Sequence, residues 1–416
     1  MHGHSRPLMR PLFFVETTDL GTRYCALAAR SLGYEPIFLC DPGAYSGDVR
    51  AQLLEQVVRV VDTSSVDAVV AAVHDEVGAE EATILSFVDS RLIVACRAAL
   101  ALSAPGLHPA VVALKSKAHV ASLVSELGPP TIAFRQGAIP RLELRTLLER
   151  YGALVVKPDL GAGGVGVLVL RGVRELEGLD ARLANLELPV TMRSGQFVAQ
   201  PQVAGPVLSL EGYVVGARLH ALGYTDRLEF GLTESGSEHP VDDRLAADHA
   251  EAMRAATQTL VERAGLERGY LHVEFVLSER GPVLIDANVG RLGGGPIGEL
   301  LALAHQVDPA LVYRHAIEVG VFGSDASGPY RAPAERRRAR AVLYGLARGG
   351  RILGIDAPAR PGVRHTAVLG PGDRVAPMGS DDWSWVGILT GYEPAVSDAL
   401  HELRIHTTSG TEHPCC

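Results

Sequence analysis

Apolar and amphipathic stretches alternate regularly through the first 110 residues of the chain. The amphipathic stretches at 21–33 and 91–102 predict helices, and four short apolar runs predict buried strands: 11–15, 35–40, 57–61 and 82–87. Strands that alternate with helices at this spacing predict a parallel, doubly wound sheet. Gly21 follows the first run, but no G-x-G-x-x-G pattern occurs there, so the sequence does not predict a dinucleotide site.

The pattern changes in the middle of the chain. Helices are predicted at 116–127 and 141–150, and a strand at 153–157 leads into a glycine-rich loop. From 197 to 290 the pattern favours antiparallel structure, with strands at 197–202, 208–215 and 217–225, a helix at 244–264 and a final hairpin. Beyond 323–340, a stretch rich in Gly, Pro, Ser and Arg, apolar runs predict strands of a smaller C-terminal unit at 341–348, 363–369 and 385–390.

Length and composition limit the classes of protein to consider. A chain of 416 residues is too long for one ordinary domain and has room for two or three compact lobes. Its 47% hydrophobic and 21% charged residues are typical of a soluble globular protein. The net charge of −9 argues against a nucleic-acid partner, because nonspecific binding to a phosphate backbone needs a basic face. No uninterrupted apolar stretch reaches the about 18 residues of a membrane helix, so we expect no membrane partner.

The N-terminus and the cysteines favour a cytoplasmic enzyme. The first residues lack the apolar segment of a secretory signal. The five cysteines are odd in number, and three of them lie in apolar runs, as reduced core thiols do. Cys415 and Cys416 have no Cys or His partners at zinc-binding spacing, so we expect them to lie in a mobile tail.

A glycine-rich loop follows the strand that ends at Lys157. Its glycines include Gly161, Gly163, Gly164 and Gly166, and a second apolar strand comes after them. Glycines let backbone N–H groups approach polyphosphate oxygens closely, and a lysine at the strand end adds positive charge. The loop is not a Walker A motif, since no Gly-Lys-Ser/Thr sequence opens a helix. From this motif alone, a nucleotide phosphate site and a plain glycine hairpin both stay open.

An acidic hairpin at 269–288 carries more information. Apolar and polar residues alternate through its first strand, which predicts a half-buried strand, and the turn residues 278–282 lead into the return strand. A turn centred on Arg280 places Glu274 directly opposite Asp286, and His272 opposite Asn288. All four side chains then project from the same face of the hairpin.

Two facing carboxylates are destabilising unless a proton or a cation lies between them. Glu274, Asp286 and the amide oxygen of Asn288 form an all-oxygen set, which suits Mg²⁺ or Mn²⁺ rather than zinc. The alternative is a solvated hairpin face on which the acids have no role. The residues that follow, Arg291 and the glycines at 293–295, form an open turn that could accept an anion and favour the metal site.

Together, the loop after Lys157 and the hairpin that ends in Asn288 and Arg291 resemble the ATP-grasp superfamily. The resemblance rests on their order, their separation by more than a hundred residues and the antiparallel region between them. It covers roughly residues 12–395 and is greatest to the carboxylate–amine ligases, which include L-amino-acid ligases that make dipeptides. The His272-x-Glu274 pair and the C-terminal segments 370–373 and 386–391 are similar to that subgroup.

The resemblance implies an α/β (α+β) fold with the three-lobed ATP-grasp architecture. A Rossmann-like N-terminal domain would span residues 1–112. An ATP-clamping domain of antiparallel sheets would span 113–322, with a small lobe at about 130–200 and a large lobe at about 201–322. A linker or surface crossing at 323–340 would lead to a closing domain at 341–416 with a mobile tail.

Carried over residue by residue, the resemblance implies three sets of site residues. The ATP-binding residues are Lys117, Lys157, Gly161, Gly163, Gly164, Gly166, Gln200 and Val203, with Lys115 as a competitor of Lys117. The metal ligands are Glu274, Asp286 and Asn288. The substrate-binding residues are Arg291, Gly293, Gly294, His272 and Arg227, of which Arg291 and His272 would join Lys157 in catalysis. For His272, substrate contact, proton handling and a packed or surface histidine all stay open.

The sequence departs from the family pattern at four places. Asp286 stands where Glu is usual, and one extra residue precedes Arg291. Gln200 replaces a common Glu at the segment that binds the adenine edge. Val207 stands where a Glu usually contacts the ribose, and Glu211 is the nearest substitute.

The resemblance implies an ATP- and Mg²⁺-dependent ligase, with Mn²⁺ as an alternative metal. A substrate carboxylate would attack the γ-phosphate of ATP to give an acyl phosphate and ADP, and an amine would then displace phosphate. The partners would be a small-molecule carboxylate and a small-molecule amine, with Arg227, Glu234 and His239 as candidates for the acceptor pocket. Homodimers are common among relatives. The composition, rich in Ala, Arg and Gly, is typical of a high-GC genome, and analogy with the family implies a dipeptide-like product of secondary metabolism.

Two other functions stay open. The chain could be an ATP-grasp carboxylase or phosphoribosyl-type ligase of primary metabolism, which also forms an acyl or carboxy phosphate. It could also be a non-catalytic nucleotide-binding relative. The His272-x-Glu274 pair favours the amide-forming ligase over the first alternative, and the retained lysines, acids and arginine argue against the second.

Overall fold

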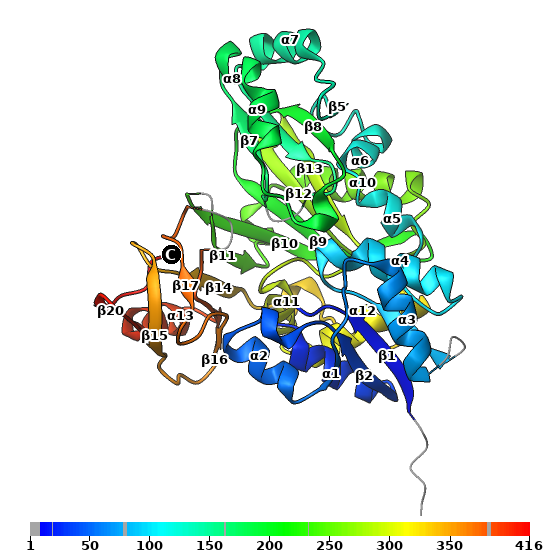
Figure 1. Cartoon of the computed structure of the whole chain (residues 1–416), viewed down its shortest axis with the longest axis vertical. Coiled ribbons are helices and arrows are strands. Elements are labelled where there is room, and N and C mark those ends of the chain that lie inside the picture. The colour runs from blue at the N-terminus through cyan, green and yellow to red at the C-terminus, as the bar shows by residue number, and fades with distance from the viewer. Residues whose placement is uncertain (1–8, 19, 78–80, 162–163, 232, 381–383) are drawn as a thin grey trace, which may run out of the picture.

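Four β-sheets organise the computed structural model, which describes residues 9–416 apart from 19, 78–80, 162–163, 232 and 381–383. The predicted α/β class is confirmed: a parallel sheet at the N-terminus is followed by antiparallel sheets. In Figure 1 the N-terminal domain, the small lobe and the C-terminal unit surround the central sheet. None of the helices in the described ranges combines the length and hydropathy that a membrane crossing requires.

The N-terminal domain is built on a parallel sheet of order β3-β2-β1-β4. Its strands are β1 (Arg10–Val15), β2 (Tyr34–Leu39), β3 (Val57–Arg59) and β4 (Thr83–Leu85). Its helices are α1 (Thr22–Ser31), α2 (Gly47–Leu54), α3 (Val66–Val77), α4 (Leu92–Ala101) and α5 (Ala110–Leu114). Phe14 of β1 shares a buried core with Cys25 of α1, whereas its neighbour Phe13 shares another with Val69 of α3. Both faces of the sheet are therefore covered, which is why its strands appear as continuous apolar runs.

The small lobe is an antiparallel sheet of order β5-β8-β6-β7 with its own core, at the top of Figure 1. Its strands are β5 (Ile132–Arg135), β6 (Leu154–Pro158), β7 (Leu168–Leu170) and β8 (Gln196–Pro201). Its helices are α7 (Arg141–Tyr151), α8 (Val173–Glu177) and α9 (Leu179–Ala184), and α6 (Lys117–Leu123) precedes the lobe. The glycine-rich loop joins β6 to β7, as the sequence predicts.

The central sheet has eight strands in the order β13-β12-β9-β10-β11-β14-β18-β16. The strands are β9 (Val207–Val215), β10 (Arg218–Phe230), β11 (Thr233–His239), β12 (Arg268–Ser278), β13 (Gly281–Val289), β14 (Ala339–Tyr344), β16 (Val363–Ala367) and β18 (Gly387–Gly391). Three helices belong to this region: α10 (Ala247–Arg263), α11 (Ile297–His305) and α12 (Pro309–Phe322).

The C-terminal region differs from the prediction. Its strands β14, β18 and β16 were expected in a smaller unit, but they continue the central sheet through β11. We did not predict β11, because its sequence Thr-Glu-Ser-Gly-Ser-Glu-His has no apolar alternation. A small sheet of order β17-β15-β19-β20 is separate: β15 (Gly350–Asp356), β17 (Arg374–Val375), β19 (Arg404–Thr407) and β20 (Gly410–Glu412), with helix α13 (Ala395–Glu402).

The expected mobile tail is also wrong. The backbone N–H of Gly345 donates to the carbonyl of Cys415 at 2.8 Å, and the N–H of Cys415 donates back to Gly345 at 3.0 Å. This reciprocal pair holds the end of the chain beside β14. Sequence spacing gave no sign of it, because backbone groups of any residue can form such a bridge.

Candidate active site

A cleft of about 1600 Å³ lies where the N-terminal domain, the small lobe, the central sheet and the C-terminal region meet. Residues from all four parts line it: Thr17, Thr18, Phe87, Val88, Asp89, Ser90, Gly164, Met192, Val207, Ser209, Thr225, Arg227, Glu234, Ser237, His272, Glu274, Asp286, Asn288, Arg291, Gly294, Gly295, Ile297, Leu343 and Trp385. Most of the predicted metal and substrate residues are thus brought to one cavity.

The hairpin of β12 and β13 has the predicted pairing at the site. Glu274 lies opposite Asp286, and His272 lies opposite Asn288. The turn itself differs from the prediction, since Ser278 pairs with Gly281 and a two-residue turn replaces one centred on Arg280. A β-bulge between Glu274 and the next pair offsets this difference, so the predicted facing pairs are kept.

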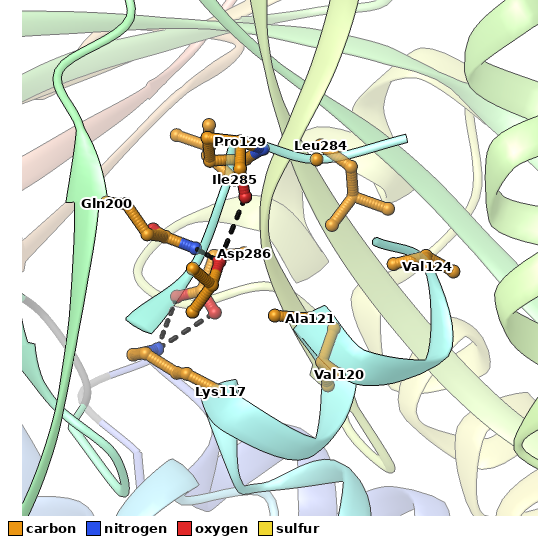
Figure 2. A pocket seen from close by; sticks show the side chains of 11 residues that line it. Lys117, Val120, Ala121, Val124, Pro129, Gln200, Leu284, Ile285 and Asp286 are labelled. Atoms are coloured by element: carbon orange, nitrogen blue, oxygen red, sulfur yellow. Dashed lines mark hydrogen bonds and ion pairs between the residues drawn. The ribbon is translucent and has the colours of Figure 1, made fainter. Parts of the chain in front are cut away.

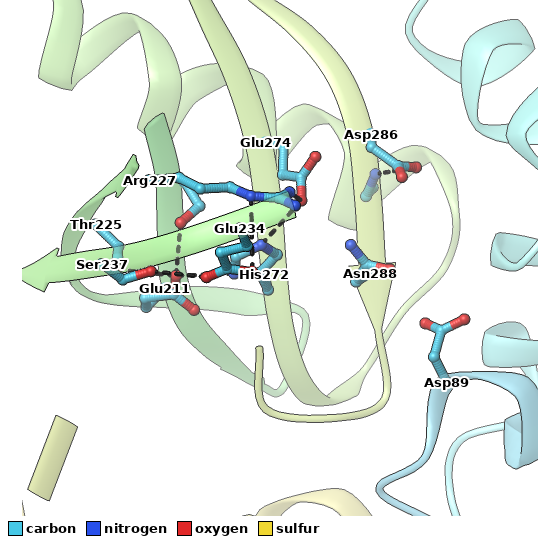
Figure 3. A network of polar contacts seen from close by, with 12 residues as sticks. Asp89, Glu211, Thr225, Arg227, Glu234, Ser237, His272, Glu274, Asp286 and Asn288 are labelled. Atoms are coloured by element: carbon cyan, nitrogen blue, oxygen red, sulfur yellow. Dashed lines mark hydrogen bonds and ion pairs between the residues drawn. The ribbon is translucent and has the colours of Figure 1, made fainter. Parts of the chain in front are cut away.

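The neighbouring strand β9 extends these pairs into two rows across three strands. Ser209, Glu274 and Asp286 form one row, and Glu211, His272 and Asn288 form the other. Side chains at alternate positions of a strand share a face, so both rows point to the same side of the sheet. Figure 3 shows five of these side chains on that side: Glu211, His272, Glu274, Asp286 and Asn288.

Two lysines meet the hairpin from other elements. Lys117, at the start of α6, donates to both carboxylate oxygens of Asp286 at 2.7 and 2.8 Å. Burial alone would lower the pKa of Lys117, but the nearby Asp286 raises it above its usual value. Lys157, at the end of β6, lies 3.5 Å from the carbonyl of Ile285, and burial lowers its pKa. Lys115 instead pairs with Asp89 at 2.5 Å, so it is Lys117 that contacts the hairpin.

His272 lies between two carboxylates (Figure 3). Its Nδ1 is 2.8 Å from Glu211, and its Nε2 is 3.2 Å from Glu274, which also faces the guanidinium of Arg227 at 3.5 Å. Burial alone would lower the pKa of His272, but the Glu211 and Glu274 carboxylates raise it to about 10. The two carboxylates therefore favour the protonated form of His272.

Glu211 does not have the surroundings expected of a ribose contact. Only 2% of it is exposed, and besides His272 it accepts bonds from Ser209 at 2.7 Å and Thr225 at 3.1 Å. It does not line the cleft. The structure makes it the partner of His272, so the expectation that it substitutes for the ribose-binding Glu is wrong.

Arg291 is held at three of its nitrogens. Its Nε donates to Asp89 at 2.9 Å, its Nη1 to the carbonyl of Leu292 at 2.8 Å and its Nη2 to Asn288 at 3.2 Å. Burial would raise the pKa of Asp89, but Lys115 and Arg291 hold it well below its usual value. A guanidinium has five N–H donors, so two remain for a ligand after these three bonds.

Asp89 is a site residue that we did not predict. It opens the short helix η3 (Asp89–Arg91), four residues beyond the end of β4. The carboxyl ends of strands in a parallel sheet are the usual place for ligand-binding residues. This rule could have marked the polar segment after β4, but nothing in the sequence pairs it with Lys115 or Arg291.

The predicted ATP-binding residues of the glycine-rich loop and of β8 do not all line the same pocket. Gly164 lines the cleft, and Gly166 has φ +75° with space only for a hydrogen, since a Cβ there would lie 2.6 Å from Leu188. Gly161 is buried beside Pro158, and Gly163 lies outside the described residues. Val203 follows β8 and lines neither of the two pockets in this region.

Gln200 lines a smaller pocket of about 320 Å³ beside the cleft (Figure 2). It donates to the hydroxyl of Thr131 at 2.9 Å, and Lys117 and Asp286 line the same pocket. The remaining walls come from β13, from α6 and from the turn after it: Val120, Ala121, Val124, Gly128, Pro129, Leu284 and Ile285. Asp286 thus lies between this pocket and the cleft, because it lines both.

Some of the predicted substrate-binding residues line the cleft and others do not. Arg227, Glu234 and Gly294 line the cleft, whereas Gly293 does not and is packed on His272, since a Cβ there would lie 2.8 Å from Nδ1. Arg227 lies between carboxylates, 3.7 Å from Glu234 and 3.5 Å from Glu274. Burial raises the pKa of Glu234.

His239 was a candidate for the acceptor pocket, but only 1% of it is exposed and it does not line the cleft. Its Nδ1 lies 3.0 Å from the hydroxyl of Thr225, and burial lowers its pKa to about 4. It is a neutral core histidine at neutral pH.

This burial predicts a pH-dependent stability. A histidine whose pKa is lower in the folded state stabilises the fold above its unfolded pKa of about 6.5, and that stability is lost as the pH falls toward 4. His239 is expected to lower the free energy of unfolding by up to about 1.4 kcal/mol for each pH unit in this range. This decrease should be absent in His239→Gln. Urea unfolding between pH 7 and 4.5 measures it, with the exposed His401→Gln as the control. Equal pH slopes in the wild type and His239→Gln would contradict the assignment.

The predicted metal ligands present an all-oxygen set to the cleft. Each carboxylate is balanced by a cation of the chain, Asp286 by Lys117 and Glu274 by His272 and Arg227. Among the described residues, no group of three or more His, Cys, Asp and Glu side chains is arranged to hold a metal. The predicted set contains two acids and the amide of Asn288, a donor chemistry that fits Mg²⁺.

Comparisons with known proteins find a family match and similar folds. Residues 132–295 match the family model of the ATP-grasp domain. The fold is similar to that of the L-amino acid ligase from Bacillus licheniformis, at 19% identity and a TM-score of 0.73, over 97% of this chain and 100% of that chain. It is also similar to phosphoribosylglycinamide synthetase from Anaerococcus prevotii, at 15% identity and a TM-score of 0.69, over 96% and 99% of the two chains.

A third similar structure contains a nucleotide and a metal. It is the biotin carboxylase domain dimer of the 2-oxoglutarate carboxylase from Hydrogenobacter thermophilus, in complex with MgADP, ADP and bicarbonate. Its identity to this chain is 14% and the TM-score is 0.69, over 98% of this chain and 92% of that chain. At these identities the likeness shows the fold. No curated protein matches the sequence.

Proposed function

We propose that the chain, whose residues 132–295 match the ATP-grasp domain, is an ATP- and Mg²⁺-dependent ligase that joins a carboxylate to an amine through an acyl phosphate. The observation that carries this proposal is the convergence on one cleft of two facing acids, Glu274 and Asp286, with the arginine Arg291. Lys117 reaches the same hairpin from the adjoining pocket through its ion pair with Asp286. Such a mixture of fixed positive groups and oxygen ligands suits the transfer of a phosphoryl group.

In the proposed reaction, a substrate carboxylate oxygen attacks the γ-phosphorus of ATP, the bond to the β–γ bridging oxygen breaks, and ADP leaves. An amine nitrogen then attacks the acyl carbon, phosphate leaves, and the nitrogen loses a proton. Negative charge develops on phosphate oxygens in both steps. Positioned cations in a dry cleft offset this charge better than mobile ions in water do.

Six side chains in or beside the cleft have roles in this proposal. Lys157 and Lys117 bind phosphate oxygens, and Arg291 uses its two remaining N–H donors on the transferred phosphoryl group. Glu274, Asp286 and Asn288 would hold Mg²⁺, which would neutralise part of the phosphate charge. Lys117 also donates to both carboxylate oxygens of Asp286. The glycine-rich loop excludes water that would hydrolyse the acyl phosphate.

The acceptor side of the cleft supports an amino-acid amine. Arg227 and Glu234 lie on this side, where a guanidinium can pair with a carboxylate and a carboxylate with an ammonium group. This makes a dipeptide-like amide the proposed product. The full-length similarity in fold to an L-amino acid ligase supports the same choice.

The experiment is an assay of phosphate release from ATP with single amino acids and with pairs of them. We expect release that depends on Mg²⁺ and that rises with at least one pair above either amino acid alone. Release stimulated by bicarbonate instead would favour the carboxylase alternative. If a broad panel of amino acids stimulates no release, the proposed amide-forming activity is wrong.

A further inference from the structure

A second cavity of about 680 Å³ lies at the junction of three parts of the chain and shares no lining residue with the catalytic cleft. Its walls come from the α1 region, from α2, from α11 and from β16: Leu20, Arg23, Tyr24, Gln52, Glu299, Arg364, His365 and Thr366. We call it the α1–β16 cavity. The proposed function uses none of these residues.

One guanidinium nitrogen of this cavity lacks a partner. The Nη1 of Arg364 is buried and meets no hydrogen-bond acceptor in the part of the chain that the structure describes. Across the same described residues, neither Arg364 nor Arg23 forms an ion pair, although many other arginines do, such as Arg340 with Glu393. Two guanidinium groups that lack a carboxylate partner in the described ranges and lie on the wall of one cavity favour an anionic ligand there.

The one carboxylate in the wall does not serve these arginines. Only 3% of Glu299 is exposed, and both of its oxygens already accept hydrogen bonds. Tyr24 donates its hydroxyl proton to one of them at 2.6 Å, and Thr390 donates to the other. The cavity therefore presents guanidinium N–H donors and no unengaged carboxylate.

We propose that the α1–β16 cavity binds a small oxyanion, through a carboxylate or phosphate group held between Arg364 and Arg23. A guanidinium donates two parallel hydrogen bonds to either group, and two guanidinium groups match an anion that carries two negative charges. The remaining walls, such as Leu20 and the ring of Tyr24, leave room for a compact ligand.

Such a ligand would link three parts of the fold. Arg23 belongs to the N-terminal domain, Arg364 to strand β16 and Glu299 to α11. Helix α11 begins at Ile297, which lines the catalytic cleft two residues before Glu299. The anion stabilises this junction, and it acts on the arrangement of the cleft through α11 without entering it.

The test is a titration of the full chain with inorganic phosphate and, separately, with malonate, at constant ionic strength set by chloride. Thermal unfolding and isothermal calorimetry are followed in the presence and absence of saturating Mg²⁺ and a non-hydrolysable ATP analogue, which fills the phosphate positions of the cleft. We expect a saturable rise in Tm and a binding isotherm that persist with the bound analogue. A response to phosphate alone assigns a phosphate ligand, and a response to malonate alone assigns a carboxylate ligand.

The variants decide whether the response comes from this cavity. Arg364→Gln is expected to weaken binding at least about tenfold, and Arg23→Gln to weaken it in the same direction. Arg374→Gln, at an exposed arginine of β17, keeps wild-type binding. If Arg364→Gln does not fold, Arg364→Lys and Arg23→Gln carry the comparison.

Three outcomes would overturn the proposal. The first is no saturable response to either anion. The second is equal binding by the wild type and by the Arg364 and Arg23 variants, which would place the ion elsewhere. The third is a change of molar mass from dimer to monomer in Arg364→Gln or Arg23→Gln, measured by light scattering, because the arginines would then face a second copy of the chain.

Discussion

Replacing Glu274 by Gln is expected to lower Mg²⁺-dependent ATP turnover by about 10²- to 10³-fold. The amide keeps the size of the side chain but removes the negative charge that faces Asp286 across the hairpin. Asp286→Asn is expected to have an effect of similar size, because it also leaves the buried amine of Lys117 without its carboxylate. Phosphate release measured against Mg²⁺ concentration gives both values.

The matched control is Glu279→Gln, an exposed acid in the turn of the same hairpin. It should keep wild-type turnover and the wild-type requirement for Mg²⁺. Urea unfolding of all three variants separates lost chemistry from lost fold. Wild-type turnover in Glu274→Gln and Asp286→Asn would refute the metal site that we assign to them.

Arg291→Lys is expected to lower kcat by about 10²-fold with little change in the KM for ATP. Lysine keeps the charge, but one ammonium group cannot reproduce the separate bonds to Asp89, to Asn288 and to the carbonyl of Leu292. The positive charge would then no longer be fixed where the phosphoryl group is transferred. Steady-state kinetics at saturating amino acids measure the split between kcat and KM.

Asp89→Asn tests the support of this arginine from the N-terminal domain. It should lower kcat in the same direction but by less, and its effect should be mostly absent in an Arg291→Lys background, because the two residues act as one unit. Arg280→Lys, in the exposed hairpin turn, is the control. Additive effects of the two substitutions, or full activity in Arg291→Lys, would contradict this account.

Local patterns in the sequence were sufficient to predict the hairpin. Alternation of polar and apolar residues placed His272, Glu274, Asp286 and Asn288 on one face, and the structure confirms their pairing. The turn was predicted wrongly, and a bulge restored the predicted facing pairs. A bulge depends on local backbone conformation, which residue periodicity does not reveal.

Contacts between distant segments could not be predicted in the same way. Lys117 and Asp286 are separated by 169 positions, and Asp89 and Arg291 by 202. The identities of these residues indicate charge but not which opposite charge they meet. The role of Glu211 was not predicted for the same reason, because its pairing with His272 follows only from the register of β9 on β12.

The parallel sheet was predictable, but the C-terminal region was not. Strands buried on both faces give continuous apolar runs, as in β1 and β2, and these are visible without any knowledge of contacts. Strand β11 joins the central sheet to β14 and is made of small and polar residues. With that strand missing from the prediction, the later strands had no visible connection to the central sheet and were expected to form a unit of their own.

The most direct test of the proposed reaction follows one oxygen atom. An amino-acid pair that stimulates phosphate release is supplied with ¹⁸O in both carboxylates, together with unlabelled ATP and Mg²⁺, and the released phosphate is analysed by mass spectrometry. An acyl phosphate transfers one carboxylate oxygen to phosphate, so we predict one ¹⁸O in each phosphate released with each amide formed. Amide formation with unlabelled phosphate, or with AMP and pyrophosphate as products, would contradict the account.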